Sequence, residues 1–98
     1  MCGATQGGLT LDGVDTATAT VIQGSVVRDD QPVSGAYVRL LDQAGEFTAE
    51  VPTSATGQFR FFAAPGRWTL RTLAPKAATV DSAVVARQGN VAEVLVRL

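Results

Sequence analysis

Histidine is absent from this 98-residue chain, and cysteine occurs once. Histidine is the commonest general base and the commonest metal ligand of proteins, so its absence argues against both an enzyme and a metal site. A single cysteine excludes an intramolecular disulfide and a cysteine-cluster zinc site. The sequence also lacks a paired acid–base constellation and a phosphate-binding loop. We therefore expect no enzyme active site, no metal and no cofactor.

An excess of charge of one sign and long apolar runs are also missing. Charged residues make up 17% of the chain, the net charge is −1, and the arginines and the one lysine are scattered singly along it. A nucleic acid is therefore not an expected partner. No apolar run approaches the roughly 20 residues that cross a bilayer, and the N-terminal residues are small and polar, without an apolar signal core. We expect no membrane association and a cytoplasmic location.

Two pairs of aspartates raise the question of a calcium site: Asp12 with Asp15, and Asp29 with Asp30. Calcium takes about six to eight oxygen ligands. Neither pair has further oxygen ligands at a defined spacing. Since aspartate is also common in turns, we interpret both pairs as solvated turn residues.

The residues that are present favour β-structure. The hydrophobic fraction is 46%, and the β-branched and aromatic residues lie in short alternating runs between clusters of glycine, proline and aspartate. This pattern is typical of an all-β sandwich or barrel. A chain of this length buries roughly 60–65% of its unfolded surface and cannot be divided into two cores, so we expect one domain.

The clearest pattern occupies residues 58–73. Phe59 and Phe61 alternate with polar residues, a Pro65-Gly66 turn follows, and Trp68 then alternates with arginines. Aromatic side chains gain most from burial. The stretch therefore predicts a β-hairpin at the centre of the hydrophobic core. Its aromatic residues would also suit a sugar-binding face, but their strict alternation favours the core.

Five further strands are predicted, each bounded by turn residues, over residues 18–27, 33–40, 47–51, 80–85 and 91–98. Together with the hairpin they make seven short antiparallel strands, which predicts a two-sheet sandwich. Gly24, between Ile22 and Val26 on one strand face, indicates a close backbone approach or a bulge. Residues 1–17 contain four glycines and are expected to form a flexible N-terminal arm, so the sandwich would span residues 18–98.

Tyr37 and Phe62 are the candidate binding residues. The period of two places each of them opposite the core-facing residues of its strand. If exposed, they would form a small apolar patch suited to a partner protein or to a homodimer. The alternative is that they are single exposed apolar side chains, which are normal on protein surfaces.

Cys2 is the one chemically reactive candidate. Methionine is normally removed before a small second residue, so the mature chain would begin with a cysteine whose own α-ammonium favours the thiolate. A glycine-rich arm would let this thiolate reach another protein's active site and accept a persulfide sulfur. The alternative is an incidental thiol. An N-terminal nucleophile hydrolase would use similar chemistry, but it needs a larger scaffold and an oxyanion hole for which the sequence has no signal.

Four segments carry a family resemblance: residues 21–29, 31–40, 56–61 and 66–70. Together they resemble the carboxypeptidase regulatory-like domains, which implies a transthyretin-like (prealbumin-like) sandwich. Such domains serve as structural additions, adhesion modules and ligand binders, so a carbohydrate- or protein-adhesion role is one implied function. Some related surface sandwiches form a Lys–Asn isopeptide bond. Lys76 and Asn90 fall in predicted connections, so we do not expect that crosslink here.

A narrower resemblance rests on Met1-Cys2-Gly3-Ala4 and on residues 40–42, 46–51 and 59–66. These are similar to an actinobacterial family of unassigned biochemistry that is linked to sulfur metabolism, the SseC family. Its members are typically encoded next to a rhodanese-type thiosulfate sulfurtransferase. The resemblance implies a role in sulfur metabolism and supplies no established catalytic residues. Together with the missing catalytic groups, it leads us to expect a non-catalytic accessory or binding module that partners such an enzyme. The alternative, which rests on the chemistry of Cys2, is a persulfide carrier.

Overall fold

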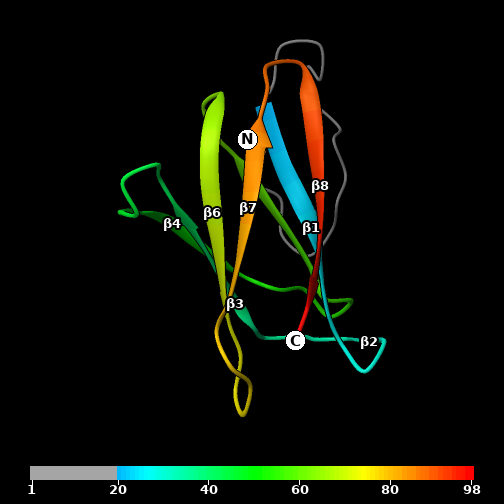
Figure 1. Cartoon of the computed structure of the whole chain (residues 1–98). Coiled ribbons are helices and arrows are strands. Elements are labelled where there is room, and N and C mark those ends of the chain that lie inside the picture. Colours follow the sequence, from blue (N-terminus) through cyan, green and yellow to red (C-terminus); the bar gives the residue numbers. More distant parts are fainter. Residues whose placement is uncertain (1–19) are drawn as a thin grey trace.

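The computed structural model describes residues 20–98, which form two β-sheets packed face to face (Figure 1). The predicted all-β sandwich is confirmed. Among the described residues no helix has the length and apolar character needed to span a membrane. The strands are β1 (Thr20–Arg28), β2 (Gln31–Pro32), β3 (Tyr37–Leu41), β4 (Phe47–Pro52), β5 (Gln58–Phe62), β6 (Gly66–Leu73), β7 (Val80–Ala86) and β8 (Asn90–Arg97).

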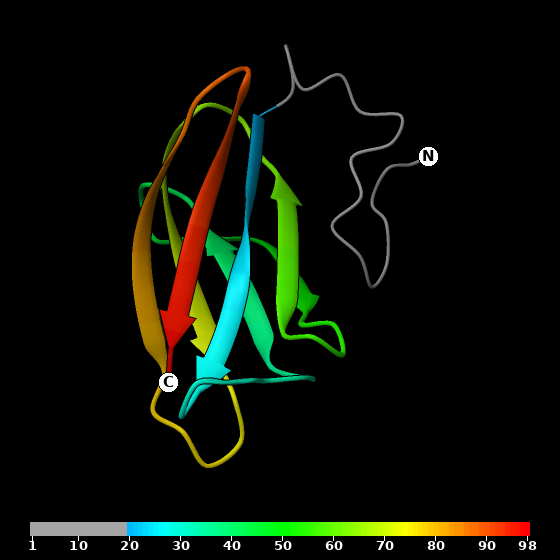
Figure 2. The same cartoon turned by 90° about the vertical axis from the view of Figure 1, so that its right-hand side faces the viewer.

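The first sheet is built around β1. Strand β5 pairs antiparallel with Val21–Ser25 on one side, and β2 pairs with the last two residues of β1. On the other side, β8 runs parallel to β1 from Thr20 to Val27. Figure 2 shows β1 between β5 and β8. We refer to these four strands as the β1 sheet.

The second sheet has the order β4-β3-β6-β7, and all of its pairs are antiparallel. Strands β6 and β7 are longer than β3. The pairing of β3 with β6 ends at Leu41 and Thr69, whereas β6 and β7 stay paired as far as Gly66 and Ala86. The first residues of β6 therefore extend past the end of β3. We refer to these four strands as the β3 sheet.

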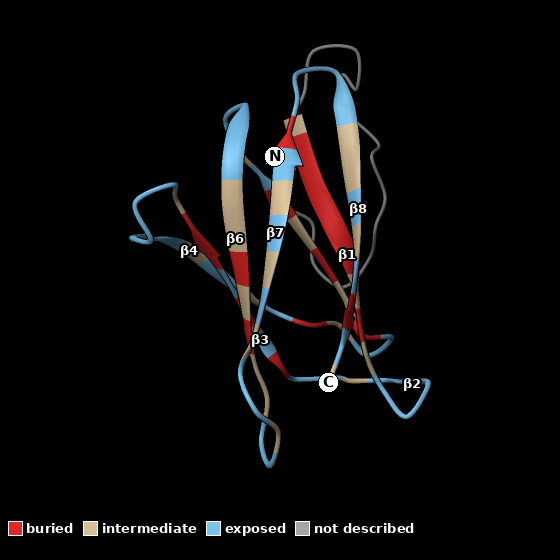
Figure 3. Cartoon of the chain, viewed as in Figure 1, coloured by how far each residue is buried: buried red, intermediate tan, exposed pale blue. Residues whose placement is uncertain are grey.

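The core lies between the sheets and takes side chains from both (Figure 3). The rings of Phe59 and Phe61 lie 6.2 Å apart at an angle of 56° and are both buried, as predicted. Trp68 is half-buried and packs against the edge of this core. The other buried members are Ile22, Val26, Ala36, Val38, Leu40, Leu70, Ala86 and Val96.

The prediction of a β-hairpin over residues 58–73 is wrong. Strand β5 pairs with β1, and β6 pairs with β3 and β7, so the two strands belong to different sheets. The Ala63 N–H donates a hydrogen bond to the carbonyl of Thr20, which keeps the end of β5 with β1. Pro65 has no N–H to donate to a ladder, and the chain crosses to the other sheet there. The alternation does mark two strands that face the core, but they contribute to it from opposite sheets.

Two details of the predicted sandwich also differ. Residues 20–98 form eight strands instead of the seven predicted, and the β1–β8 pair is parallel. The extra strand is β2, which lies between two predicted strands and pairs with the end of β1. The predicted strand over residues 33–40 forms only from Tyr37 onward, because Gly35, whose φ is 74°, interrupts it. The Thr53 hydroxyl holds this interruption: it accepts a hydrogen bond from the Ala36 N–H at 3.0 Å and donates one to the Val33 carbonyl at 2.7 Å.

Gly24 lies where two backbones come very close, as the sequence predicts. It is paired with Val94 of β8 and Phe59 of β5. A Cβ atom at this position would lie 1.8 Å from the carbonyl oxygen of Val94 and 2.9 Å from the ring of Phe59. Since real Cβ atoms do not approach backbone atoms so closely, only glycine fits here.

Candidate functional site

A row of four charged residues crosses the outer face of the β3 sheet. The strand register places Arg39 opposite Glu50 and Arg71, and Arg71 opposite Asp81. Arg39 Nε donates to Glu50 Oε2 at 2.7 Å. Arg71 donates twice to Asp81, from Nε to Oδ1 at 2.9 Å and from Nη2 to Oδ2 at 3.0 Å. We call these four residues the charged row.

The pair at the β7 end of the row is electrostatically coupled. The hydrogen bonds and the positive charge of Arg71 lower the pKa of the Asp81 carboxyl below its ordinary value, and the same pair raises the pKa of Arg71. Both side chains are nearly half exposed, so water screens the attraction. The pair therefore fixes the direction of the two side chains more than it stabilises the fold.

Apolar surface adjoins the charged row. Tyr37 is 50% exposed, and its strand position is opposite Leu73 of β6 and Pro52 of β4. A shallow depression of about 230 Å³ is lined by Tyr37, Leu73 and the Arg39–Glu50 pair. This part of the face combines an exposed aromatic ring with oriented charges, which is the composition of many protein–protein contact sites.

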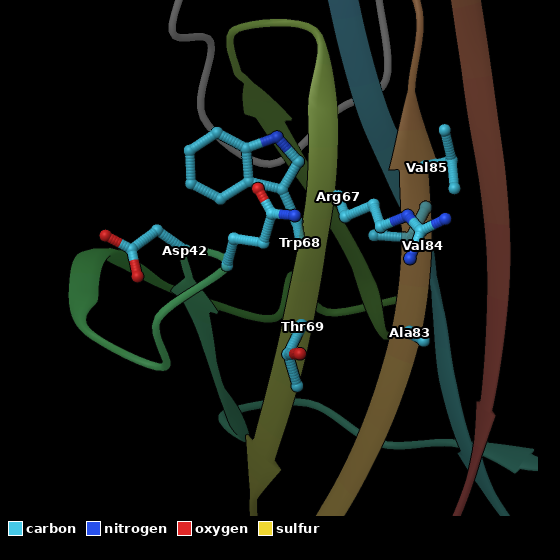
Figure 4. Close-up of a pocket in the computed structure, with 8 residues that line it drawn as sticks. Asp42, Arg67, Trp68, Thr69, Ala83, Val84 and Val85 are labelled. Carbon is cyan, nitrogen blue, oxygen red and sulfur yellow. The ribbon is translucent and has the colours of Figure 1, made fainter.

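A larger groove lies at the end of the same sheet where β6 extends past β3 (Figure 4). Its volume is about 540 Å³, and we call it the β6 groove. Trp68 lies on the side of β6 that faces the turn after β3, and Arg67 extends across β7 (Figure 4). The lining residues are Asp42, Gln43, Arg67, Trp68, Thr69, Ala83, Val84 and Val85.

The outer face of the β1 sheet has a different character. Arg60 Nε donates to Gln23 Oε1 at 3.2 Å, and Gln23 Nε2 donates to Glu93 Oε2 at 2.8 Å. Gln23 is only 8% exposed, and the neighbouring Val21 is fully buried although it points away from the core. Burial lowers the pKa of the Arg60 guanidinium. The outer face of the β1 sheet therefore carries a partly buried chain of side-chain hydrogen bonds, whereas that of the β3 sheet carries exposed ion pairs.

Tyr37 and Phe62 are both exposed, but the structure separates them. Tyr37 belongs to β3 and Phe62 belongs to β5, so they lie on the outer faces of different sheets. They therefore do not form the single apolar patch expected from the sequence. The reason is the wrong pairing predicted for β5, whose true partner is β1.

The remaining sequence candidates are placed as follows. Cys2, Asp12 and Asp15 lie outside the described residues. Within residues 20–98 no cluster of three or more His, Cys, Asp or Glu side chains could hold a metal ion. Lys76, in the connection at the foot of β6 and β7, and Asn90, at the opposite end where β8 begins, are too far apart for an isopeptide bond (Figure 1).

The charged row and the β6 groove were missed from the sequence. Both Arg39 and Arg71 alternate with apolar residues, which signals an outward direction but gives no partner. The row exists only because β3 and β6 are neighbours, and the predicted hairpin gave β6 the wrong neighbour. The groove depends on the unequal lengths of β3 and β6, which no sequence signal specified.

The sequence pattern of a family described as "Protein of unknown function (DUF1416)" matches residues 2–98. Two proteins of Mycobacterium tuberculosis strain H37Rv, uncharacterized proteins Rv0814c and Rv3118, are each 58% identical to this chain over 91 residues, which is 91% of this chain and 89% of theirs. An uncharacterized protein of Mycolicibacterium smegmatis is 64% identical over 62 residues, or 62% of this chain and 69% of that protein.

Solved structures share the fold at low sequence identity. The TIE protein of Bacillus anthracis matches with a TM-score of 0.70 and 15% identity, over 79% of this chain and 16% of that one. The minor pilin GBS52 of Streptococcus agalactiae also gives 0.70, at 13% identity, over 82% and 44%. A dioxygenase domain from a Streptomyces species gives 0.66 at 11% identity, over 84% and 80%. These likenesses establish the β-sandwich fold.

Proposed function

We propose a function for this chain, which belongs to the DUF1416 family of proteins of unknown function: it is a non-catalytic binding module associated with sulfur metabolism. Its partner is a rhodanese-type thiosulfate sulfurtransferase. The resemblance to the SseC family supplies the partner class. The observation that carries the proposal is the outer face of the β3 sheet, where Tyr37 and Leu73 adjoin the charged row.

The non-catalytic part of the proposal rests on the chemistry of the described residues. In residues 20–98 the ionisable groups with shifted pKa values are Arg60 and the exposed Arg71–Asp81 pair. Arginine and an ion-paired aspartate are poor general bases at neutral pH, because one keeps its proton and the other has little affinity for one. Nothing in this part of the chain resembles a nucleophile beside a base.

The proposed contact uses the two kinds of side chain on this face differently. An aromatic ring that is half exposed on a rigid strand gives a large contact area at low entropic cost. The charged row adds orientation, since oriented charges beside an apolar contact favour one register of the partner over others. The face therefore suits a partner whose surface places an apolar contact next to complementary charges.

The proposal predicts different effects for the two exposed aromatic residues. In a calorimetric titration of the protein with its cognate sulfurtransferase, Tyr37→Ala is expected to weaken binding by roughly tenfold or more, which is the usual effect of removing a central aromatic side chain. The matched control is Phe62→Ala, which removes an exposed aromatic ring from the other sheet and is expected to leave the affinity unchanged.

Two outcomes would contradict the proposal. One is the absence of any complex with the wild-type protein at low salt, and the other is an equal loss of affinity in both variants.

Intact mass spectrometry after incubation with thiosulfate and the sulfurtransferase tests the alternative that the protein is a persulfide carrier. A mass gain of one sulfur atom that reductant removes and that Cys2→Ser abolishes would make the protein a persulfide acceptor, contrary to the non-catalytic module.

A further inference from the structure

The β6 groove offers side chains that the fold itself does not use. Strand β3 ends opposite Thr69, and the chain then turns away through residues 42–46. Asp42 Oδ1 accepts hydrogen bonds from the N–H groups of Ala44 and Glu46, both at 2.9 Å, and so holds this turn. The turn forms one wall of the groove and the start of β6 forms the other. The space of about 540 Å³ lies within the range of small-molecule sites.

Trp68 provides a fixed aromatic surface in this groove. Its Nε1–H donates a hydrogen bond to the Ala64 carbonyl at 2.9 Å, and part of the ring packs against the core. The indole therefore has a set orientation before any ligand arrives. Gln43, from the turn after β3, lines the same groove. In one groove, an indole can stack on the C–H face of a sugar ring while an amide hydrogen-bonds its hydroxyls.

Arg67 supplies the charge of the groove. It is exposed, and its guanidinium makes no ion pair or hydrogen bond with any residue in the described part of the chain. The acid that also lines the groove, Asp42, is engaged in its turn and projects away from Trp68 (Figure 4). A guanidinium without a partner is suited to bidentate binding of a carboxylate.

We infer that the β6 groove binds a short acidic oligosaccharide, with one sugar ring against Trp68 and Gln43 and a carboxylate on Arg67. Val85, opposite Arg67 in the register, and the neighbouring Ala83 are exposed on the same face of the sheet as Arg67, and they give an apolar surface for the second ring. An added peptide strand fits less well, because the edge of β6 beyond β3 is only Gly66 to Trp68, too short for a useful backbone ladder.

The only tryptophan of the chain is Trp68, so its fluorescence reports on the groove directly. Titration with digalacturonate is expected to give a saturable change, and galactobiose, its neutral counterpart, is expected to bind roughly tenfold more weakly because it lacks the carboxylates. Arg67→Gln is expected to remove this preference, and Gln43→Ala is expected to weaken both sugars. Matched controls at the opposite end of the molecule are Arg97→Gln and Gln31→Ala, which should bind like the wild type.

Several results would overturn the inference. They are the absence of a saturable response to either disaccharide, equal affinity for the two, or an unchanged preference in Arg67→Gln. Binding of tetraglutamate at least as tightly as digalacturonate would assign the groove to acidic peptides and remove the sugar. Amide NMR spectra of each variant verify that it is folded, so that a lost response reports on the groove.

Discussion

Gly24 shows how one residue permits the pairing of two strands. A side chain there would meet the backbone of Val94, which cannot move without breaking the parallel β1–β8 ladder. We predict that Gly24→Ala lowers the free energy of unfolding by about 3 kcal/mol or more. Urea denaturation measures this, with Gly45→Ala as the control. Gly45 has open space around it, so only its positive φ of 83° adds a cost, about 1 kcal/mol. Similar stabilities for the two variants would contradict this account.

Thr72 carries a buried hydroxyl that the fold leaves unsatisfied. The residue is fully buried, and its Oγ1 has no hydrogen-bond partner in the described structure. Valine has nearly the same shape without the polar atom, so we predict that Thr72→Val raises the free energy of unfolding by about 1 kcal/mol. Denaturant unfolding at neutral pH measures the change. A loss of stability would mean that the hydroxyl has a partner, such as a buried water.

The same substitution at Thr53 should have the opposite sign. Its hydroxyl bonds the Ala36 N–H and the Val33 carbonyl, and both partners would lose that bond in Thr53→Val. We predict a loss of about 2 kcal/mol in the free energy of unfolding, measured in the same way. A neutral effect would show that the connection between β2 and β3 does not depend on this side chain.

Strands β6 and β7 are joined on their outer face by a pH-sensitive contact. Arg71 lowers the pKa of Asp81 below its ordinary value of 3.8 in the folded protein. A lowered pKa contributes stability that is present above the unfolded value and is lost as the pH falls through the folded value. We predict that the melting temperature of Asp81→Asn lies slightly below that of the wild type at neutral pH and that the difference disappears at acid pH.

Carboxyl carbon NMR titration verifies the cause of this difference. Asp81 is expected to titrate below 3.8 in the wild type and close to that value in Arg71→Gln. An unchanged Asp81 titration in Arg71→Gln would show that the ion pair does not lower the pKa.

At the level of strands, sequence periodicity predicted where strands occur but not which strands pair. The alternation around Phe59 and Trp68 correctly indicated two strands that face the core. It could not separate a hairpin from two strands in opposite sheets, because both arrangements bury the same side chains. The deciding features are tertiary: the bond from Ala63 to Thr20, and the pairing of β6 with β3. The expected patch of Tyr37 and Phe62 depended on this pairing. With β5 and β6 in one sheet the two residues could share a face, but β3 and β5 belong to different sheets.

At the scale of the whole molecule, the two outer faces differ. The face of the β1 sheet holds Gln23 at 8% exposure within a polar chain from Arg60 to Glu93, so little of its centre is accessible. The face of the β3 sheet exposes Tyr37 and the charged row, and it ends in the β6 groove. Phe62 and Leu95 are exposed on the β1 sheet, but only the face of the β3 sheet combines an exposed aromatic ring with oriented ion pairs and a groove, so we expect the partner to bind there.

The most direct test of the proposed module maps the partner onto these faces. Amide NMR spectra of the labelled protein would be recorded with increasing amounts of unlabelled cognate sulfurtransferase. The account predicts that the largest shifts and line broadening fall on Tyr37–Leu41 and on Gly66–Leu73, the central strands of the β3 sheet. Changes confined to β1, β5 and β8, or unchanged spectra at saturating partner, would contradict it.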